Sequence, residues 1–231
     1  NITEMKVEGR RTSDNVEDRR GMSTGKMAIG GGIGTVVIVL IVLLLGGDPS
    51  QVVNTMQQDA GTESGPVSST PEEEAMVNFV SVVLAGTEDV WTEIFRQSKM
   101  TYRKPTLVLF RDQVQSACGY ATAASGPFYC PGDEKVYIDL NFFDALKTSY
   151  GANGDFAVAY VLAHEIGHHV QNQLGILDQV NRQRSQMGET SANKLLVRLE
   201  LQADFLAGMW AHYDQKMFNS LEQGDVEEAM T

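Results

Sequence analysis

The residues of this chain that could do chemistry gather in the segment His164-Glu165-Ile166-Gly167-His168, which holds two of its four histidines. In a helix, His164 and His168 lie one turn apart on one face, where both imidazoles can bind a single tetrahedral zinc ion. Glu165 is rotated by about 100° around the helix axis, so its carboxylate can reach a zinc-bound water without being a ligand itself. The pattern H-E-x-x-H therefore predicts a zinc hydrolase with Glu165 as the catalytic base.

The alternative is an ordinary amphipathic helix whose polar groups are solvated or satisfied in a core. The nearly uncharged run 156–163 leads into the motif, which predicts a largely buried helix that opens with Asp155 and stops at Gly175. Buried imidazoles and carboxylates need partners, and a metal ion supplies them. His169 points about 100° away from His168, so we expect it to be a hydrogen-bonding neighbour rather than a fourth ligand.

A third ligand is expected from a second helix, and Glu200 is the best candidate. Apolar residues at helical spacing follow Ser191 as far as Met209, which predicts an amphipathic helix capped by Ser191. Glu200 and Asp204 lie four residues apart, on one face of it. Glu200 would bind the metal, and Asp204 would accept the outer N–H of His164 and fix its tautomer. The alternative is that these two acids belong to a solvated helix face.

Several further segments complete a resemblance to a known family. The chain resembles the neutral zinc metallopeptidases of bacterial membranes, the YpfJ-like proteins, over nearly its whole length; the matching residues are 10–21, 116–119, 126–131, 136–140, 164–168 and 200–204. The resemblance implies a single-pass membrane protein whose α+β, zincin-like metallopeptidase domain holds one zinc ion. Relative to this family, residues 1–4 precede the usual start near Met5, and we expect the family's chains to continue past Met230.

Two segments, 106–110 and 136–140, have the composition and spacing of strands. In the zincin fold that the domain resembles, a strand just before the active-site helix can form the exposed sheet edge along which an extended peptide substrate lies. The second segment would supply that edge through Val136, Tyr137, Ile138, Asp139 and Leu140. The alternative is a plain core strand. The predicted domain thus combines an active-site helix with a small sheet.

An apolar stretch before this domain predicts a membrane anchor. Residues 27–47 carry no charge, and a helix needs about 20 residues to span a bilayer core. A cleavable signal peptide is the rival, but no small-x-small cleavage site follows the apolar run. Six basic residues precede the stretch and the next basic residue is Arg96, which predicts a cytoplasmic N-terminus and an extracytoplasmic catalytic domain in the bacterial cell envelope.

The predicted organisation has four parts: a cytoplasmic N-terminal tail (1–26), a transmembrane helix (27–47), a flexible linker (48–69) and the metallopeptidase domain (70–231). The linker is rich in Gly, Ser, Gln and Thr, and Thr70-Pro71-Glu72-Glu73 predicts the start of a helix. Residues 48–231 hold 25 acidic against 12 basic side chains, which argues against nucleic-acid binding. The bilayer, through 27–47, is the expected lipid partner.

Cys118 and Cys130 are the two cysteines of the chain, and both follow the apolar stretch. In an oxidising compartment they can close a short loop as a disulfide. Two reduced, buried thiols are the alternative. A zinc site built on them is disfavoured because no third and fourth ligand lie nearby in the sequence.

The function these residues favour is hydrolysis of peptide bonds in peptide or protein substrates. Zinc bound by His164, His168 and Glu200 would keep its fourth position for water, and Glu165 would accept that water's proton as general base. The residue that stabilises the oxyanion stays open among Tyr137, Tyr150 and His212. Two alternatives remain: a zinc-stabilised, membrane-tethered scaffold without peptidase activity, and a zinc hydrolase of a non-peptide amide in the cell envelope.

Overall fold

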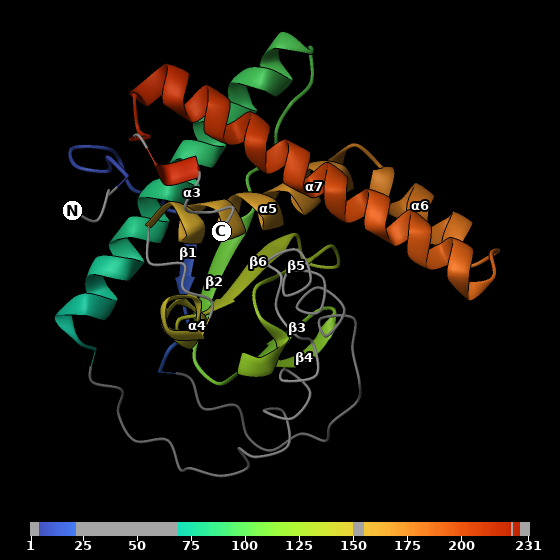
Figure 1. Cartoon of the computed structure of the whole chain (residues 1–231), viewed down its shortest axis with the longest axis horizontal. Coiled ribbons are helices and arrows are strands. Elements are labelled where there is room, and N and C mark those ends of the chain that lie inside the picture. Colours follow the sequence, from blue (N-terminus) through green and yellow to red (C-terminus); the bar gives the residue numbers. More distant parts are fainter. Residues whose placement is uncertain (1–4, 22–68, 150–154, 223, 227–231) are drawn as a thin grey trace.

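The centre of the fold is a four-stranded sheet in the order β1-β2-β6-β5, as Figure 1 shows. The computed structural model describes residues 5–21, 69–149, 155–222 and 224–226. Strands β1 (Val16–Asp18), β2 (Thr106–Phe110) and β6 (Lys135–Asp139) run parallel, whereas β5 (Phe128–Cys130) runs antiparallel to β6. The strands at 106–110 and 136–140 are thus present, the second shifted by one residue, and the mixed α+β class is confirmed.

Alternate residues of the sheet face two different cores, because successive side chains of a strand point to opposite faces. Leu107 and Leu109 of β2 and Ile138 of β6 belong to the large core that the helices cover. Val108 of β2 and Tyr137 of β6 belong to a smaller core on the opposite face. The hairpin of β3 (Gln113–Ser116) and β4 (Gly119–Thr122) contributes to that smaller core, and a short 3₁₀ helix (Ala123–Ser125) follows it.

Five helices accompany the described strands. Helix α3 (Pro71–Gln97) starts with the predicted cap: Thr70 accepts from the Glu73 N–H, and the Glu73 carboxylate accepts from the Thr70 N–H. Helix α5 (Asp155–Gln173) packs between the sheet and α7 (Glu189–Phe218), and α3 packs against both helices. The remaining helices are α4 (Asn141–Ser149) and α6 (Ile176–Arg184). Helix α7 begins two residues before Ser191, and Gly188 rather than Ser191 is its N-cap.

The described part of the predicted N-terminal tail lies within the domain. Residues 5–21, which we call the N-terminal arm, supply strand β1, and Val16 pairs in register with Leu107 of β2. Met5, at the start of the arm, is buried in the large core. Residues 5–21 therefore belong to the folded domain, because a strand that pairs in register is part of the sheet, and the predicted end of the tail at residue 26 lies outside the described residues.

The predicted membrane helix at 27–47, and all but the last residue of the predicted linker, lie outside the described residues. Within the described ranges, no helix is both long enough and apolar enough to cross a bilayer.

Candidate metal centre

The two helices that carry the predicted ligands, α5 and α7, cross at very close range. A Cβ atom placed on Gly167 of α5 would lie 2.9 Å from the carbonyl oxygen and 3.1 Å from the Cα of Ala203 on α7. Ala203 itself has no exposed surface. A glycine facing an alanine thus brings the helix backbones together, and this contact lies between His164 and His168 along α5 and beside Glu200 on α7.

The structure brings His164, His168 and Glu200 together. Glu200 Oε2 lies 3.4 Å from His164 Nε2 and 3.1 Å from His168 Nε2. One ligand atom from each residue lies within 4.8 Å of the others, and all three residues are buried. The three residues predicted as ligands, two on α5 and one on α7, therefore lie close together in space.

Each of the two imidazole rings makes a hydrogen bond through Nδ1, the ring nitrogen that does not face Glu200. His164 Nδ1 lies 2.8 Å from Asp204 Oδ1, the partner predicted from the sequence. His168 Nδ1 lies 2.9 Å from Oε1 of Gln171. If each Nδ1 carries the proton and donates to these acceptors, each Nε2 has a free lone pair directed toward Glu200. This is the tautomer that a metal-binding histidine requires.

Gln171 and Tyr160 extend this support, and the sequence analysis missed both. The Gln171 amide nitrogen donates to the Leu199 carbonyl at 2.8 Å, which ties α5 to α7 next to Glu200. Tyr160 donates its hydroxyl to Asp204 Oδ1 at 3.0 Å. Each lies three or four residues from a predicted ligand on the same helix, at 160 and 164 or at 168 and 171. That spacing is the signal that could have identified them.

The electrostatics of the three residues reflect their mutual contact. Burial works against protonation of His164, but the nearby carboxylates of Asp204 and Glu200 outweigh it and raise the His164 pKa to about 10. Burial would raise the pKa of Glu200, but His164 and His168 lower it to about 2. When no metal ion is bound, protonated histidine and ionised Glu200 attract each other. A divalent cation can take the place of those protons.

Glu165 differs from the other two carboxylates of the site, Glu200 and Asp204, which both contact ligand histidines. Its side chain is almost completely buried, and among the described residues neither carboxylate oxygen has a hydrogen-bond partner of ordinary geometry. Burial raises its pKa, while the neighbouring histidines and the backbone N–H of Tyr129 favour the ionised form. A buried carboxylate without partners is costly, so its retention beside the ligands points to a role in chemistry.

The three residues suit a zinc ion. Tetrahedral bonds of about 2.0–2.1 Å place ligand atoms roughly 3.3 Å apart, and the two Nε2–Oε2 distances are 3.4 and 3.1 Å. Two imidazoles and one carboxylate form the donor set of catalytic zinc sites that leave a fourth position open. His164 Nε2 is buried without a hydrogen-bond partner among the described residues, which is consistent with a ligand atom.

His169 lies outside the cluster, as its direction on the helix predicts. Its Nδ1 contacts the Tyr129 hydroxyl at 3.0 Å and its Nε2 contacts the Arg103 carbonyl oxygen at 2.6 Å. Burial lowers the pKa of His169. The residue thus connects α5 to strand β5 and to the segment before β2.

The candidates for stabilising an oxyanion are not brought to the cluster. Tyr137 lies in the smaller core, where its ring stacks on Phe128 and its hydroxyl donates to Asp133. His212 is exposed, with its ring against Tyr213. Tyr150 lies outside the described residues. Because α5 covers the opposite face of the sheet, Tyr137 cannot reach the metal site.

The strand predicted to bind substrate is not an edge. β6 lies between β2 and β5, and Val136, Tyr137, Ile138, Asp139 and Leu140 are all buried. β5 pairs with residues 135–137 of β6 and β2 pairs with residues 135–139, so the backbone of Val136 and Tyr137 has a strand on both sides and is not free to pair with a peptide, whereas the ladder with β5 ends at Tyr137. The edge strands of this sheet are β1 and β5, which the order of segments along the chain does not indicate.

The predicted disulfide is present between Cys118 and Cys130, with Cα atoms 5.7 Å apart. It joins the turn of the β3–β4 hairpin to strand β5. The bond therefore fixes the hairpin over the smaller core, away from the metal cluster.

An α+β domain with two histidines and a glutamate converging from two helices, and a second glutamate buried beside them, is the arrangement of a zinc hydrolase. The chain belongs to the family described as "Putative neutral zinc metallopeptidase", whose sequence profile matches residues 5–231.

Two groups of relatives place the chain further. It is 43% identical over 234 residues to the uncharacterized protein YpfJ of Escherichia coli (strain K12), an alignment covering 98% of this chain and 81% of that protein. It is 39% identical over 175 residues to an uncharacterized protein of Mycobacterium tuberculosis (strain ATCC 25618 / H37Rv), covering 74% of this chain and 58% of that protein. No solved structure gives a significant match.

Proposed function

We propose that this protein is a zinc-dependent peptidase in which Glu165 transfers the proton of the attacking water. The observation that carries the proposal is the buried Glu165 carboxylate, which lacks a hydrogen-bond partner of ordinary geometry among the described residues and adjoins the His164, His168 and Glu200 cluster. A structural zinc site is closed by four protein ligands and has no use for such a group. The cluster offers three ligands among the described residues, which favours a catalytic site over a scaffold.

The residues of the site divide the work among them. His164, His168 and Glu200 would hold one zinc ion, which when bound supplies a Lewis acid that activates water and polarises a carbonyl. Asp204 and Gln171 keep the two imidazoles in the ligating tautomer.

Glu165 would act on the proton rather than on the metal. Its carboxylate accepts a proton as water attacks the scissile carbonyl and returns that proton to the departing amine. Burial raises the pKa of Glu165, which moves it toward the working range of an acid–base group at neutral pH. Glu200 contacts both ligand histidines and Asp204 contacts His164, so Glu165 is the carboxylate beside them that is free to accept this proton.

Substrate class and location are parts of the same proposal. The substrate is a peptide or protein, in keeping with the family description. Membrane association through residues 27–47 rests on their uncharged, apolar sequence. The Cys118–Cys130 disulfide supports an oxidising, extracytoplasmic compartment for the domain.

The test compares the zinc-loaded full-length protein with its Glu165→Gln variant on a complex peptide mixture read by mass spectrometry. We expect Glu165→Gln to bind zinc in equal amount and to lose about 10²–10⁴-fold of the cleavage rate. Glu93→Gln, which changes a partly exposed glutamate on α3, is the matched control and should cleave as the parent does.

Equal cleavage by the parent and by Glu165→Gln would contradict the assigned role of this residue. Zinc bound one-to-one without cleavage by either protein would favour a non-peptide amide substrate or a zinc-stabilised scaffold. Hydrolysis of small acyl-amide compounds by the parent would then separate those two alternatives.

A further inference from the structure

The N-terminal arm is attached to the rest of the domain along its whole described length. Near its start, the Lys6 N–H donates to the Ser220 carbonyl at 2.8 Å. Near its end, the Arg19 N–H donates to the Leu109 carbonyl at 2.8 Å, beside the parallel pairing of β1 with β2. The arm therefore contacts both the segment that follows α7 and the central sheet.

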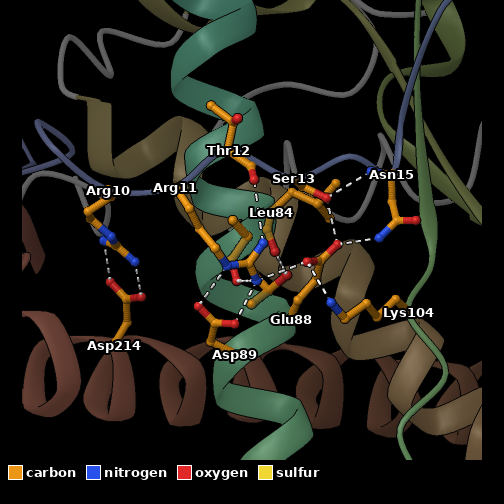
Figure 2. Close-up of polar contacts among 12 residues, drawn as sticks. Arg10, Arg11, Thr12, Ser13, Asn15, Leu84, Glu88, Asp89, Lys104 and Asp214 are labelled. Carbon is orange, nitrogen blue, oxygen red and sulfur yellow. Dashed lines mark hydrogen bonds and ion pairs between the residues drawn. The ribbon is translucent and has the colours of Figure 1, made fainter.

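Glu88 on α3 receives most of its hydrogen bonds from the arm, as Figure 2 shows. Its side chain is 1% exposed and accepts from the Ser13 hydroxyl at 2.6 Å and from the Asn15 amide at 2.7 Å. Arg11 donates to its other oxygen at 3.0 Å. Lys104 forms one more ion pair at 3.3 Å and is, among the described residues, the one polar partner of Glu88 from outside the arm. Without the arm, this buried carboxylate would keep a single cation.

Asp214 on α7 depends on the arm in the same way. Its side chain has no exposed surface, and Arg10 donates to its two oxygens at 2.6 and 3.0 Å (Figure 2). Gly86 on α3 makes room for this pair, because a Cβ there would lie 2.5 Å from Arg10 and 2.6 Å from Asp214. A bidentate ion pair that packs against a glycine, where a Cβ would clash with it, is a specific binding site for the arm.

The arginines of the arm, which suggested a cytoplasmic N-terminus, are engaged in the fold. Arg10 pairs with Asp214, and Arg11 pairs with Glu88 and Asp89. Further along, Arg19 pairs with Glu17 within the arm, and Arg20 pairs with Asp18 and with Glu74 of α3. The positive-inside rule applies to basic residues in loops beside a membrane span, and ion pairs of this kind account for the same arginines without it.

We propose that the N-terminal arm and the domain formed by residues 69–226 lie on the same side of the membrane. Were they on opposite sides, Asp214 and Glu88 would be buried without their arginines and β2 would lose its neighbour β1, so the described fold could not form. The orientation predicted from the basic residues, with the tail and the domain separated, conflicts with this fold.

The first test compares the sidedness of two single cysteines in the full-length protein expressed in bacteria. Asp14→Cys lies on the arm and Ser98→Cys follows α3; both positions are exposed, and the native cysteines are joined in a disulfide. A membrane-impermeant maleimide is applied to spheroplasts and to lysed spheroplasts. We expect both cysteines to react before lysis or both to react only after it. Reaction of one before lysis and the other only after it would overturn the proposal.

The second test asks whether the arm is seated. Arg10→Ala should lower the melting temperature of the full-length protein, because Asp214 is left buried and unpaired. Adding Asp214→Asn should recover part of the loss, since the unpaired charge is removed. Glu8→Ala, an exposed change in the same arm, should leave the melting temperature unchanged.

An unchanged melting temperature in Arg10→Ala, or no recovery in the double variant, would show that the arm is not docked and would overturn the proposal. Neither test uses the metal site, so the outcome is independent of whether the protein cleaves peptides.

Discussion

Glu88 and Glu165 are both glutamates on long helices with 1% of their surface exposed, yet their surroundings are opposite in kind. Glu88 accepts from Arg11, Ser13 and Asn15, and Lys104 adds an ion pair. Glu165 has no hydrogen-bond partner of ordinary geometry among the described residues. Glu88 has its pKa lowered, because these hydrogen bonds outweigh burial, whereas burial raises the pKa of Glu165.

The difference separates a structural buried charge from a functional one. In the cluster around Glu88 every strong acceptor is used, so the cluster holds the N-terminal arm to α3 and has little capacity to bind anything else. The carboxylate of Glu165 is left free beside the place where three possible metal-ligand atoms, from His164, His168 and Glu200, converge. Burial alone does not distinguish the two sites; the count of satisfied hydrogen bonds does.

The largest expected effect concerns stability at these two positions. Glu88→Gln should lower the free energy of unfolding by about 3 kcal/mol, because an amide cannot satisfy the two cations that Glu88 holds. Glu165→Gln should leave stability unchanged or raise it by up to about 1 kcal/mol, because it replaces a buried group that lacks a partner. Urea denaturation of both variants at pH 7 without added zinc measures the difference. Equal losses at the two positions would remove the contrast.

Asp139 supplies an intermediate case and a pH dependence. It accepts from the N–H groups of Asp112 and Asn141 but pairs with no cation in the described structure, and burial raises its pKa to about 6. The folded protein thus binds this proton more tightly than the unfolded chain does. Its stabilising contribution is complete below about pH 4 and is lost as pH rises through 6, a change of about 3 kcal/mol.

Unfolding free energies of the parent and of Asp139→Asn at pH 4.5 and pH 7 test this. Asp139→Asn should show a smaller loss of stability between the two pH values than the parent. A parent-like pH dependence in the variant would assign the effect to other groups.

The close contact of α5 with α7 should matter more to the metal site than ordinary helix packing does. Gly167→Ala places a methyl group against the Ala203 backbone, so α7 and Glu200 must move away, at a cost of about 2 kcal/mol in stability together with weaker zinc binding. Gly208 lies on α7, and a Cβ placed there meets nothing within 4 Å. Gly208→Ala should therefore stabilise α7 by about 0.5–1 kcal/mol. Thermal melts and zinc titrations of the two variants provide the measurement. A harmless Gly167→Ala would mean that the helices are not held at this distance.

The smallest expected effect tests the hydrogen bond behind His168. Gln171→Leu should weaken zinc binding by at least about tenfold, because the His168 Nδ1–H loses its acceptor. Gln202→Ala removes a neighbour that contacts Gln171 but neither histidine, and should change the zinc affinity little. Competition with a chelating dye gives both affinities. Identical affinities in parent and Gln171→Leu would show that this contact does not orient the ligand.

Local patterns in the sequence were sufficient wherever the interacting residues lie within a helix turn of each other. The i, i+4 spacing of His164 and His168 and of Glu200 and Asp204 follows from helix geometry, and so does the capping box at Thr70 and Glu73. The same reasoning excluded His169 from the cluster. The disulfide was also within reach, because the chain has two cysteines and a short segment between them.

Contacts between distant segments were decided by the tertiary structure. No local rule indicates that residues 16–18 pair with a strand that lies more than 80 residues later in the chain. Nor does a local rule indicate that β6 is a central strand and that β5 forms the edge of the sheet opposite β1. Gly167 is an unremarkable helix residue until it is seen against Ala203. Helix periodicity specifies the face on which a residue lies; the packing of that face against a partner specifies whether a carboxylate there is paired, as in Glu88, or left free for chemistry, as in Glu165.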